Sequence, residues 1–315
     1  MTTDLTEILV VGDDDTGHLA QITNLVFEHG VNIEDLDQDV RDGAFRMTMH
    51  VDTSEMECSR DELRDSLSTL GDDLGLDIRV RYPEGPGTAS IAALVTKESH
   101  CLEALLEAAE SGRIDADVDV VIGNRPRLRS LAEEYDVPFH DVADENGVPD
   151  EDELLELLDE YEVDLIALAR YIRILGPEVV FRYQHRIINV HPSLLPAFPG
   201  AAAYTQAIEG GVRIAGVTAH YVTPDLDQGP IITQRAFNVP DDAETDDLRE
   251  RGQPLEADAF VEAIRLHLNG DVEIGRGRTY VDDDDAQLGL PQEADDLNPD
   301  EPVDEDLTVA AHGDD

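Results

Sequence analysis

The spacing of apolar positions over the first 82 residues alternates between strand and helix periods. Leu19, Ile22, Leu25 and Val26 fall on one face of a helix that stops at Gly30, because side chains three or four positions apart share a helix face. Two alternating runs joined by a short polar turn predict a hairpin. The predicted strands are 5–11, 31–40, 44–51 and 76–82, and the predicted helices are 18–28 and 60–70. This βαββαβ order is the ferredoxin-like α+β arrangement.

After a Pro/Gly-rich stretch at 82–88 (YPEGPGT), buried-type strands alternate with helices. Such alternation predicts a doubly wound, mostly parallel α/β sheet. The predicted strands are 91–95, 118–122, 138–142, 165–168 and 186–191, the helices are 102–109, 125–134, 151–161, 177–183 and 256–268, and a last hairpin or strand is 272–281. We therefore expect an N-terminal domain at 1–84, a second domain at 88–281, and a disordered acidic tail at 282–315.

The charge balance changes which partners are possible. The chain has 72 acidic against 22 basic residues, a net charge of −50, and Lys97 is its only lysine. Nucleic acid and anionic membranes would be repelled. The acidic residues are spread through every predicted helix and loop, which is typical of solvated faces. A salt-rich cytoplasm, hence a halophilic protein, would explain their number because salt screens self-repulsion.

The sequence shows no pattern typical of a targeting segment or a membrane span, and it contains two cysteines. The N-terminus has no basic and apolar signal pattern, and no run of about 18 apolar residues occurs. We expect a soluble, cytoplasmic protein in which Cys58 and Cys101 are free thiols.

The candidate chemistry lies between residues 188 and 234. Asn189 and His191 are two positions apart at the end of an apolar strand, so both side chains point to one face. Prolines then end the strand, at the edge where open α/β sheets bind ligands. The turn-rich loop TPDLDQGP can bring Asp227 to them. An amide and an imidazole can stabilise an oxyanion while a carboxylate accepts a proton, which suits attack on a carbonyl.

A lone histidine beside a proline-rich loop is more often a turn hydrogen bonder than a catalyst. The whole string, with INVHPSLLPAFPG (188–200) and GVTAHYVTPDLDQGPIITQ (216–234), resembles the formyltransferase family that uses 10-formyltetrahydrofolate. The resemblance implies that Asn189, His191 and Asp227 are catalytic, with His220 in support. The stretch ALARYIRILGPE (167–178) resembles the folate-binding segment of that family. The remaining substrate-binding candidates are Arg173, Ile174, Leu175 and Val222.

The turn after strand 91–95 bears on the acceptor of the formyl group. It reads TKESHCLEAL and has no glycine between Thr96 and Glu110, which disfavours a phosphate cradle. It resembles the matching turn of formyltetrahydrofolate deformylases rather than that of glycinamide ribonucleotide formyltransferases. Ser99 with His100 could also be an ordinary helix cap.

The string TGHLAQITNLVFEHGVNIEDLDQDV (16–40) resembles an ACT domain, a regulatory module that commonly binds amino acids. That resemblance implies a possible amino-acid effector. The alternative is a scaffold that only pairs subunits through its sheet. The implied regulatory residues are Asp14, Thr16, Gly17, His18, Asn32 and Ile33.

An ACT-like domain before a formyltransferase-like domain is the arrangement of formyltetrahydrofolate deformylases, and the resemblance covers about 5–281. It implies hydrolysis of 10-formyltetrahydrofolate to formate and tetrahydrofolate, which feeds one-carbon metabolism and purine synthesis, by a homo-oligomer. Pro192 and Leu194 depart from the deformylase pattern and match transformylases, and Ala202 and Ala203 replace the usual Arg-Pro.

Two alternatives stay open: transfer of the formyl group to an amine such as glycinamide ribonucleotide, and an amino-acid-sensing module that only binds folate. We expect no cofactor besides the folate substrate. We also expect no metal, since the His and Cys residues lack a zinc-ligand spacing.

Overall fold

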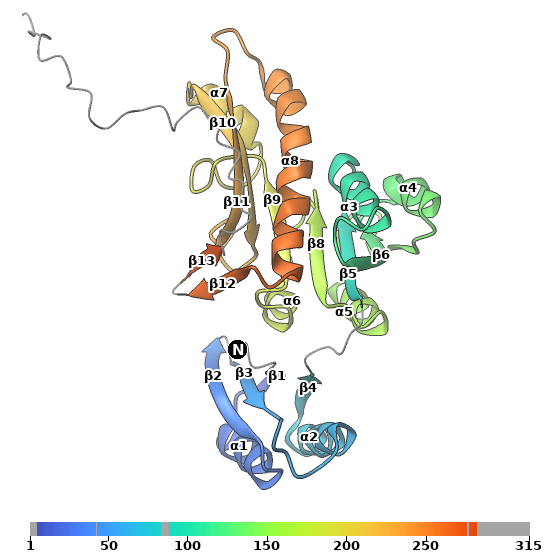
Figure 1. The fold of residues 1–315 in the computed structure, drawn as a ribbon, viewed down its shortest axis with the longest axis vertical. Helices are drawn as coiled ribbons and strands as arrows, with labels where there is room; N and C mark the ends of the chain where they lie inside the picture. The colour runs from blue at the N-terminus through green and yellow to red at the C-terminus, as the bar shows by residue number, and fades with distance from the viewer. Residues whose placement is uncertain (1–4, 42, 83–87, 276, 282–315) are drawn as a thin grey trace, which may run out of the picture.

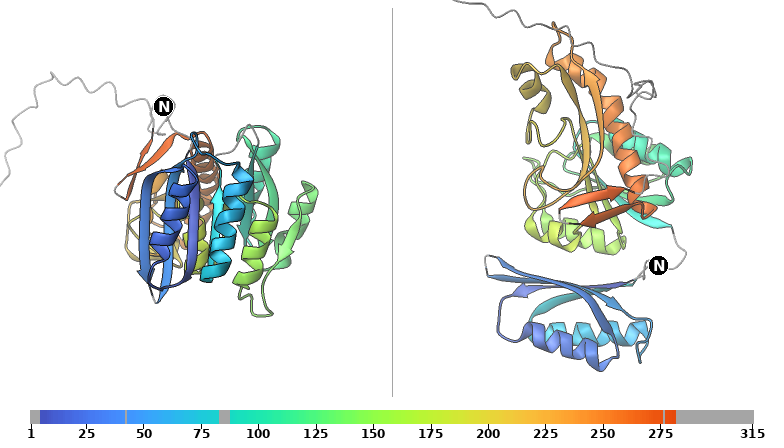
Figure 2. Two further views of the ribbon diagram at one scale, coloured as in Figure 1. Left: turned by 90° about the horizontal axis from the view of Figure 1, so that it is seen from below. Right: turned by 60° about the vertical axis from the view of Figure 1, so that its left-hand side comes forward.

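The computed structural model describes residues 5–41, 43–82, 88–275 and 277–281. Residues 83–87 of the predicted linker (82–88) and the predicted tail 282–315 fall outside them. The N-terminal part is a four-stranded antiparallel sheet in the order β2-β3-β1-β4. Its two helices cover one face (Figure 2). The elements are β1 (Thr6–Asp13), α1 (His18–Glu28), β2 (Asn32–Arg41), β3 (Ala44–Asp52), α2 (Arg60–Leu74) and β4 (Leu76–Arg81).

The predicted βαββαβ order is confirmed, and α2 is longer than predicted. It runs to Leu74 and ends at Gly75, whose φ of 69° is the left-handed conformation that favours glycine. Gly71 lies inside the helix because it packs against β4, where a Cβ would come within 2.6 Å of the Leu76 carbonyl oxygen. The predicted helix ended at residue 70, whereas the missing Cβ of Gly71 lets the helix continue in close contact with β4.

The second part is a seven-stranded sheet in the order β11-β10-β9-β8-β5-β6-β7 (Figure 1). The strands β9, β8, β5, β6 and β7 are parallel to one another. At one edge, β10 pairs antiparallel with β9, and β11 pairs antiparallel with β10. The expected mostly parallel α/β sheet is therefore confirmed. The strands are β5 (Ala89–Val95), β6 (Ala116–Gly123), β7 (Phe139–Asp141), β8 (Leu165–Ala169), β9 (Ile187–His191), β10 (Ile214–Tyr221) and β11 (Ile231–Asn238).

Helices cover both faces of this sheet. Helices α3, α4 and α8 share one hydrophobic core with it, and α5 and α6 share the other. The helical elements are α3 (His100–Glu110), the 3-10 turn η1 (Pro126–Leu128), α4 (Arg129–Glu134), α5 (Glu151–Glu160), α6 (Pro177–Arg182), α7 (Ala203–Glu209) and α8 (Thr245–Leu268). A small hairpin of β12 (Val272–Gly275) and β13 (Arg278–Val281) follows.

Helix α8 corrects one predicted boundary. We expected it to begin at Glu256, but it begins at Thr245 and contains Pro254. A capping box, in which Glu244 and Asp247 satisfy each other's backbone N–H groups, starts the helix. Burial of Leu248 and Gly252 on its first turns then compensates for the hydrogen bond that the proline removes.

The uncovered face of the N-terminal sheet faces the end of the large sheet that carries α6 (Figures 1 and 2). Arg186, just before β9, donates to Glu7 of β1 at 3.0 Å. Arg182, the last residue of α6, pairs with Asp77 of β4 at 2.8 Å. The N-terminal domain is thus bonded to the segment that leads into β9. Within the described ranges, no helix is long and apolar enough to cross a membrane.

Candidate active site

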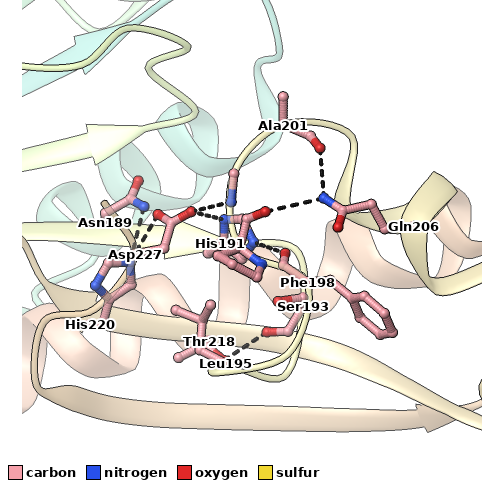
Figure 3. Close-up of polar contacts among 12 residues, drawn as sticks. Asn189, His191, Ser193, Leu195, Phe198, Ala201, Gln206, Thr218, His220 and Asp227 are labelled. Carbon is pink, nitrogen blue, oxygen red and sulfur yellow. Dashed lines mark hydrogen bonds and ion pairs between the residues drawn. The ribbon is translucent and has the colours of Figure 1, made fainter. Parts of the chain in front are cut away.

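Strands β9 and β10 bring the predicted polar residues to one place. In their antiparallel register, His220 lies opposite Asn189 and Thr218 lies opposite His191. Register partners share a sheet face, so all four side chains are grouped as Figure 3 shows. The spacing of Asn189 and His191 predicted this shared face correctly.

His220 fixes the orientation of Asn189. The His220 Nδ1 atom donates to the Tyr221 carbonyl oxygen at 2.9 Å, since a carbonyl can only accept. Its Nε2 atom then accepts from Asn189 Nδ2 at 3.2 Å (Figure 3). Burial lowers the pKa of His220, which keeps the ring neutral. The 3.8 Å separation from Asp227 is therefore not an ion pair at neutral pH.

Asp227 arrives from the loop between β10 and β11, and its side chain is only 7% exposed. Its Oδ2 atom accepts from the Gly200 N–H at 2.6 Å and lies 3.4 Å from His191 Nδ1. Its backbone φ of 54° is in the left-handed region, which turns the carboxylate inward. Oδ1 accepts no hydrogen bond from a described residue, so it can receive a proton.

The structure revises the expected role of His191. Its Nε2 atom donates to the Phe198 carbonyl oxygen at 2.9 Å, and its Nδ1 atom faces Asp227. Both ring nitrogens are thus engaged, so the ring has no N–H directed at an oxyanion in this state. His191 therefore positions the carboxylate, and Asn189 keeps the second amide hydrogen for a ligand.

Sequence reasoning missed the residues that hold the loop 192–200. The buried Thr218 hydroxyl donates to the Ser193 carbonyl oxygen at 2.7 Å and accepts from the Leu195 N–H at 3.0 Å. Gln234 of β11 donates to the same hydroxyl and to the Leu195 carbonyl oxygen. The spacing of Thr218, two residues before His220 on one strand, could have identified it.

The predicted folate segment follows β8. Ile174 is 76% exposed. Arg173 donates to the Asn146 carbonyl oxygen at 3.3 Å. Leu175 instead packs into the core shared with α5 and α6, and Val222 packs partly against the same core. The Leu175 side chain is therefore structural, because its apolar surface is already buried in the protein.

A second polar cluster lies at the N-terminus of α3. Glu256 of α8 is 1% exposed and contacts His100 Nε2 at 3.0 Å and Arg170 Nε at 3.2 Å. Tyr204 also donates to it at 2.7 Å. Arg170 also donates to Glu98 at 3.1 Å, so its guanidinium is shared between two carboxylates of the protein.

His100, Cys101 and Glu256 bring three potential metal ligands within 4.8 Å of one another, which their sequence spacing did not predict. The Arg170 guanidinium on the same carboxylate would repel a cation. Burial raises the pKa of the Cys101 thiol well above its usual range, which disfavours the thiolate that binds metals. Ser99 occupies the N-cap position of α3, but its side chain makes no capping hydrogen bond to a described residue.

The predicted regulatory residues divide between two places. Gly17, with φ of 101°, precedes α1, and the buried His18 bonds the Asp13 carbonyl oxygen at 3.2 Å through Nε2. Its Nδ1 atom is buried and has no hydrogen-bond partner among the described residues. Asp14 and Thr16 lie in the adjacent exposed turn. Asn32 and Ile33 lie on β2, and no hydrogen bond or ion pair among described residues joins them to 14–18.

Comparisons with known proteins agree with both parts of the fold. The sequence pattern of the formyl transferase family matches residues 89–264, and that of the ACT domain matches residues 7–81. The formyltetrahydrofolate deformylase of Haemophilus influenzae is 36% identical over 279 residues, which cover 85% of this chain and 95% of that protein.

Solved structures show the same likeness. A deformylase from Pseudomonas syringae superposes with a TM-score of 0.60 at 29% identity, over 88% of this chain and 94% of that one. Glycinamide ribonucleotide transformylase 1 from Symbiobacterium toebii gives a TM-score of 0.59 at 37% identity, over 95% of its own chain but only 62% of this one. The deformylases match both domains of this protein. The chain therefore belongs to the formyltetrahydrofolate deformylase family.

Proposed function

We propose that the protein hydrolyses 10-formyltetrahydrofolate to formate and tetrahydrofolate. The observation that carries this proposal is the convergence of Asn189, His191 and Asp227, with Oδ1 of Asp227 left to accept a proton. The deformylase names of relatives that match most of the chain support it.

Water attacks the formyl carbon and gives a proton to Oδ1 of Asp227, and a tetrahedral oxyanion forms. The second N–H of Asn189 donates to this oxyanion, and His191 holds the Asp227 carboxylate in place beside it. The C–N bond then breaks, and the proton held by Asp227 passes to the departing folate nitrogen. No nucleophilic side chain takes part.

The cluster at α3 supports water as the acceptor. A helix N-terminus after a parallel strand is a favourable place for a phosphate. Here the buried Glu256 and the half-buried Glu98 flank the start of α3, and Arg170 is already engaged by both carboxylates. An amine that carries a ribose phosphate would meet two negative charges. Lys97, 3.7 Å from Glu98, is the only nearby lysine.

The competing reaction is formyl transfer to glycinamide ribonucleotide, which Pro192 and Leu194 favour. The test is formate release by the full chain at high salt, with and without that amine. We expect equal formate release in both, and no formylated amine. If no formate is released without the amine, and formylated amine forms when the amine is added, the protein is a transferase instead.

The proposal extends to the metabolic role of the two products and to a regulatory role of the ACT domain. The formate and tetrahydrofolate produced would balance one-carbon folates for purine synthesis, in a salt-rich cytoplasm. The ACT domain would bind an amino-acid effector near His18, whose Nδ1 atom has no partner within the described ranges. The protein would be a homo-oligomer. Glycine or methionine should then change the turnover of the full chain and not that of residues 88–315. Equal responses would leave the ACT domain a scaffold.

A further inference from the structure

The short helix α7 follows the loop that holds Asp227 in place. Gly200 donates its N–H to Oδ2 of Asp227 at 2.6 Å, and α7 begins shortly after it, at Ala203. The backbone φ is 78° at Gly200 and 59° at Ala202, so the chain turns sharply between the loop and the helix. A shift of α7 would therefore move the N–H group that holds the proton acceptor.

A glutamine side chain of α7 holds the turn on both sides of Gly200. The Nε2 atom of Gln206 donates to the Pro199 carbonyl oxygen at 3.1 Å and to the Ala201 carbonyl oxygen at 2.9 Å (Figure 3). Pro199 and Ala201 are the chain neighbours of Gly200. Because both carbonyls bind one amide group of α7, the turn and the helix are joined as a unit.

A tyrosine of the same helix fixes α7 to α8. Tyr204 is 6% exposed, and its hydroxyl donates to Oε1 of Glu256 at 2.7 Å. Gly252 makes this approach possible, since a Cβ at that position would collide with the tyrosine hydroxyl. Burial and the Glu256 charge raise the pKa of Tyr204, so the hydroxyl keeps the proton that it donates. Hydrogen bonds to a carboxylate are stronger than those between neutral groups.

Glu256 is a rigid anchor because three side chains bind it. His100 Nε2 donates to Oε2 at 3.0 Å and Arg170 Nε lies 3.2 Å from the same oxygen, which leaves Oε1 for Tyr204. Burial opposes ionisation, but the His100 hydrogen bond and the Arg170 charge outweigh it, so the pKa of Glu256 lies below its usual value. The carboxylate is thus charged, and it is held from α3 and from the end of β8, the strand beside β9.

We propose that Tyr204 and Gln206 are positioning residues for the proton acceptor. Glu256 fixes Tyr204, and Tyr204 fixes α7. Gln206 then holds the turn whose Gly200 N–H orients Asp227. Within the described ranges, neither side chain bonds to the catalytic centre itself, so both act through the turn. This inference rests on the proposed hydrolysis, and it gives the buried carboxylate cluster a role in that reaction besides excluding a phosphate.

Steady-state hydrolysis separates positioning from folate binding. Tyr204→Phe deletes only the hydroxyl, and Gln206→Met deletes both bonds to the turn while keeping the length of the side chain. We expect kcat to fall about 10-fold in Tyr204→Phe, the loss typical of a hydrogen bond to a charged group, and about 5-fold in Gln206→Met. KM for 10-formyltetrahydrofolate should stay within about twofold of the parental value, because ground-state binding is unchanged.

The NMR signal of the Gly200 amide proton reports on the same turn without any substrate. A short hydrogen bond to a carboxylate moves an amide proton downfield, so the signal should move upfield in Asp227→Asn. In Tyr204→Phe and Gln206→Met, it should move part of the way toward that position. This readout is independent of hydrolysis. If the parent releases no formate but the signal moves as expected, the proposed reaction fails and the positioning of Asp227 stands.

The matched controls make the same kinds of substitution elsewhere. Tyr161→Phe removes a hydroxyl 3.0 Å from His140 Nε2, just after α5, and Glu209→Met changes an exposed residue at the end of α7. Both should keep kcat within about twofold of the parent and leave the Gly200 signal in place.

Three results would overturn the proposal. They are parental kcat in either α7 variant, a loss of kcat without movement of the Gly200 signal, and a rise in KM with unchanged kcat, which would assign the helix to folate binding. If Tyr204→Phe fails to fold, Gln206→Met decides, since the Gln206 side chain is only half-buried.

Discussion

His191 Nδ1 lies 3.4 Å from Oδ2 of Asp227, the same oxygen that accepts the Gly200 N–H at 2.6 Å. One carboxylate oxygen is therefore held by the protein, and the other faces the site. The loop that carries Asp227 and the strand that carries His191 are joined at this point. A proton acceptor fixed in this way needs little reorganisation during the reaction.

Asp227→Asn should therefore remove most turnover. The substitution keeps the shape but deletes the proton acceptor, and loss of one general base costs about 10²- to 10⁴-fold in rate. Folate binding, measured by fluorescence quenching, should remain nearly intact. The matched control Asp225→Asn, on the same loop and exposed, should keep near-parental rates. Turnover of Asp227→Asn within a few-fold of the parent would contradict the assigned role.

Much of this site was predictable from the sequence because its residues lie on short, regular segments. Asn189 and His191 share a strand, and alternation alone places them on one face. The Gly200 N–H and the Phe198 carbonyl oxygen were not predictable, since backbone groups leave no signature in residue type. Glu256 was also missed: it reaches His100 from a helix 156 positions away, a contact that only tertiary packing creates.

The fold was likewise predictable where local patterns determine it and unpredictable where tertiary packing does. Strand and helix periods gave both domains, because each period reflects one buried face. The start of α8 was misplaced because Pro254 reads locally as a helix break, whereas packing of Leu248 overrides it. The interdomain face was not foreseen at all, since its arginines are scattered over three segments of the chain.

Stability should fall between pH 7 and pH 5 in a way that depends on His267. Burial lowers the pKa of His267 to about 4, against about 6.5 in the unfolded chain. Between these values the unfolded chain binds the extra proton, so folding stability is present above pH 6.5 and declines toward pH 4. The loss of folding stability that this shift causes from pH 7 to pH 5 amounts to about 2 kcal/mol at most.

Urea unfolding at the two pH values measures this effect. The parent should lose about 2 kcal/mol more than His267→Gln. Tyr221→Phe removes the hydroxyl that lies 2.9 Å from His267 Nδ1 but leaves the ring buried. Because burial is the main cause of the shift, this variant should keep the parental pH dependence. An identical pH dependence in His267→Gln and the parent would exclude His267 as the source.

Salt should stabilise the fold. With a net charge of −50, self-repulsion is strong when the screening length is about 10 Å, near 0.1 M salt, and weak at about 3 Å, near 1 M. The midpoint of thermal unfolding should therefore rise steadily from low to molar potassium chloride. A midpoint that stays level or falls over this range would argue against a protein adapted to high salt.

The measurement that tests the central claim most directly is turnover of 10-formyltetrahydrofolate in water enriched in oxygen-18. If Asp227 activates water for attack on the formyl carbon, each formate released should carry one oxygen from the solvent, and mass spectrometry of the formate reads this out. Formate should appear with that label in the absence of any amine. Formate without solvent label, or formyl transfer only when an amine is added, would contradict the account.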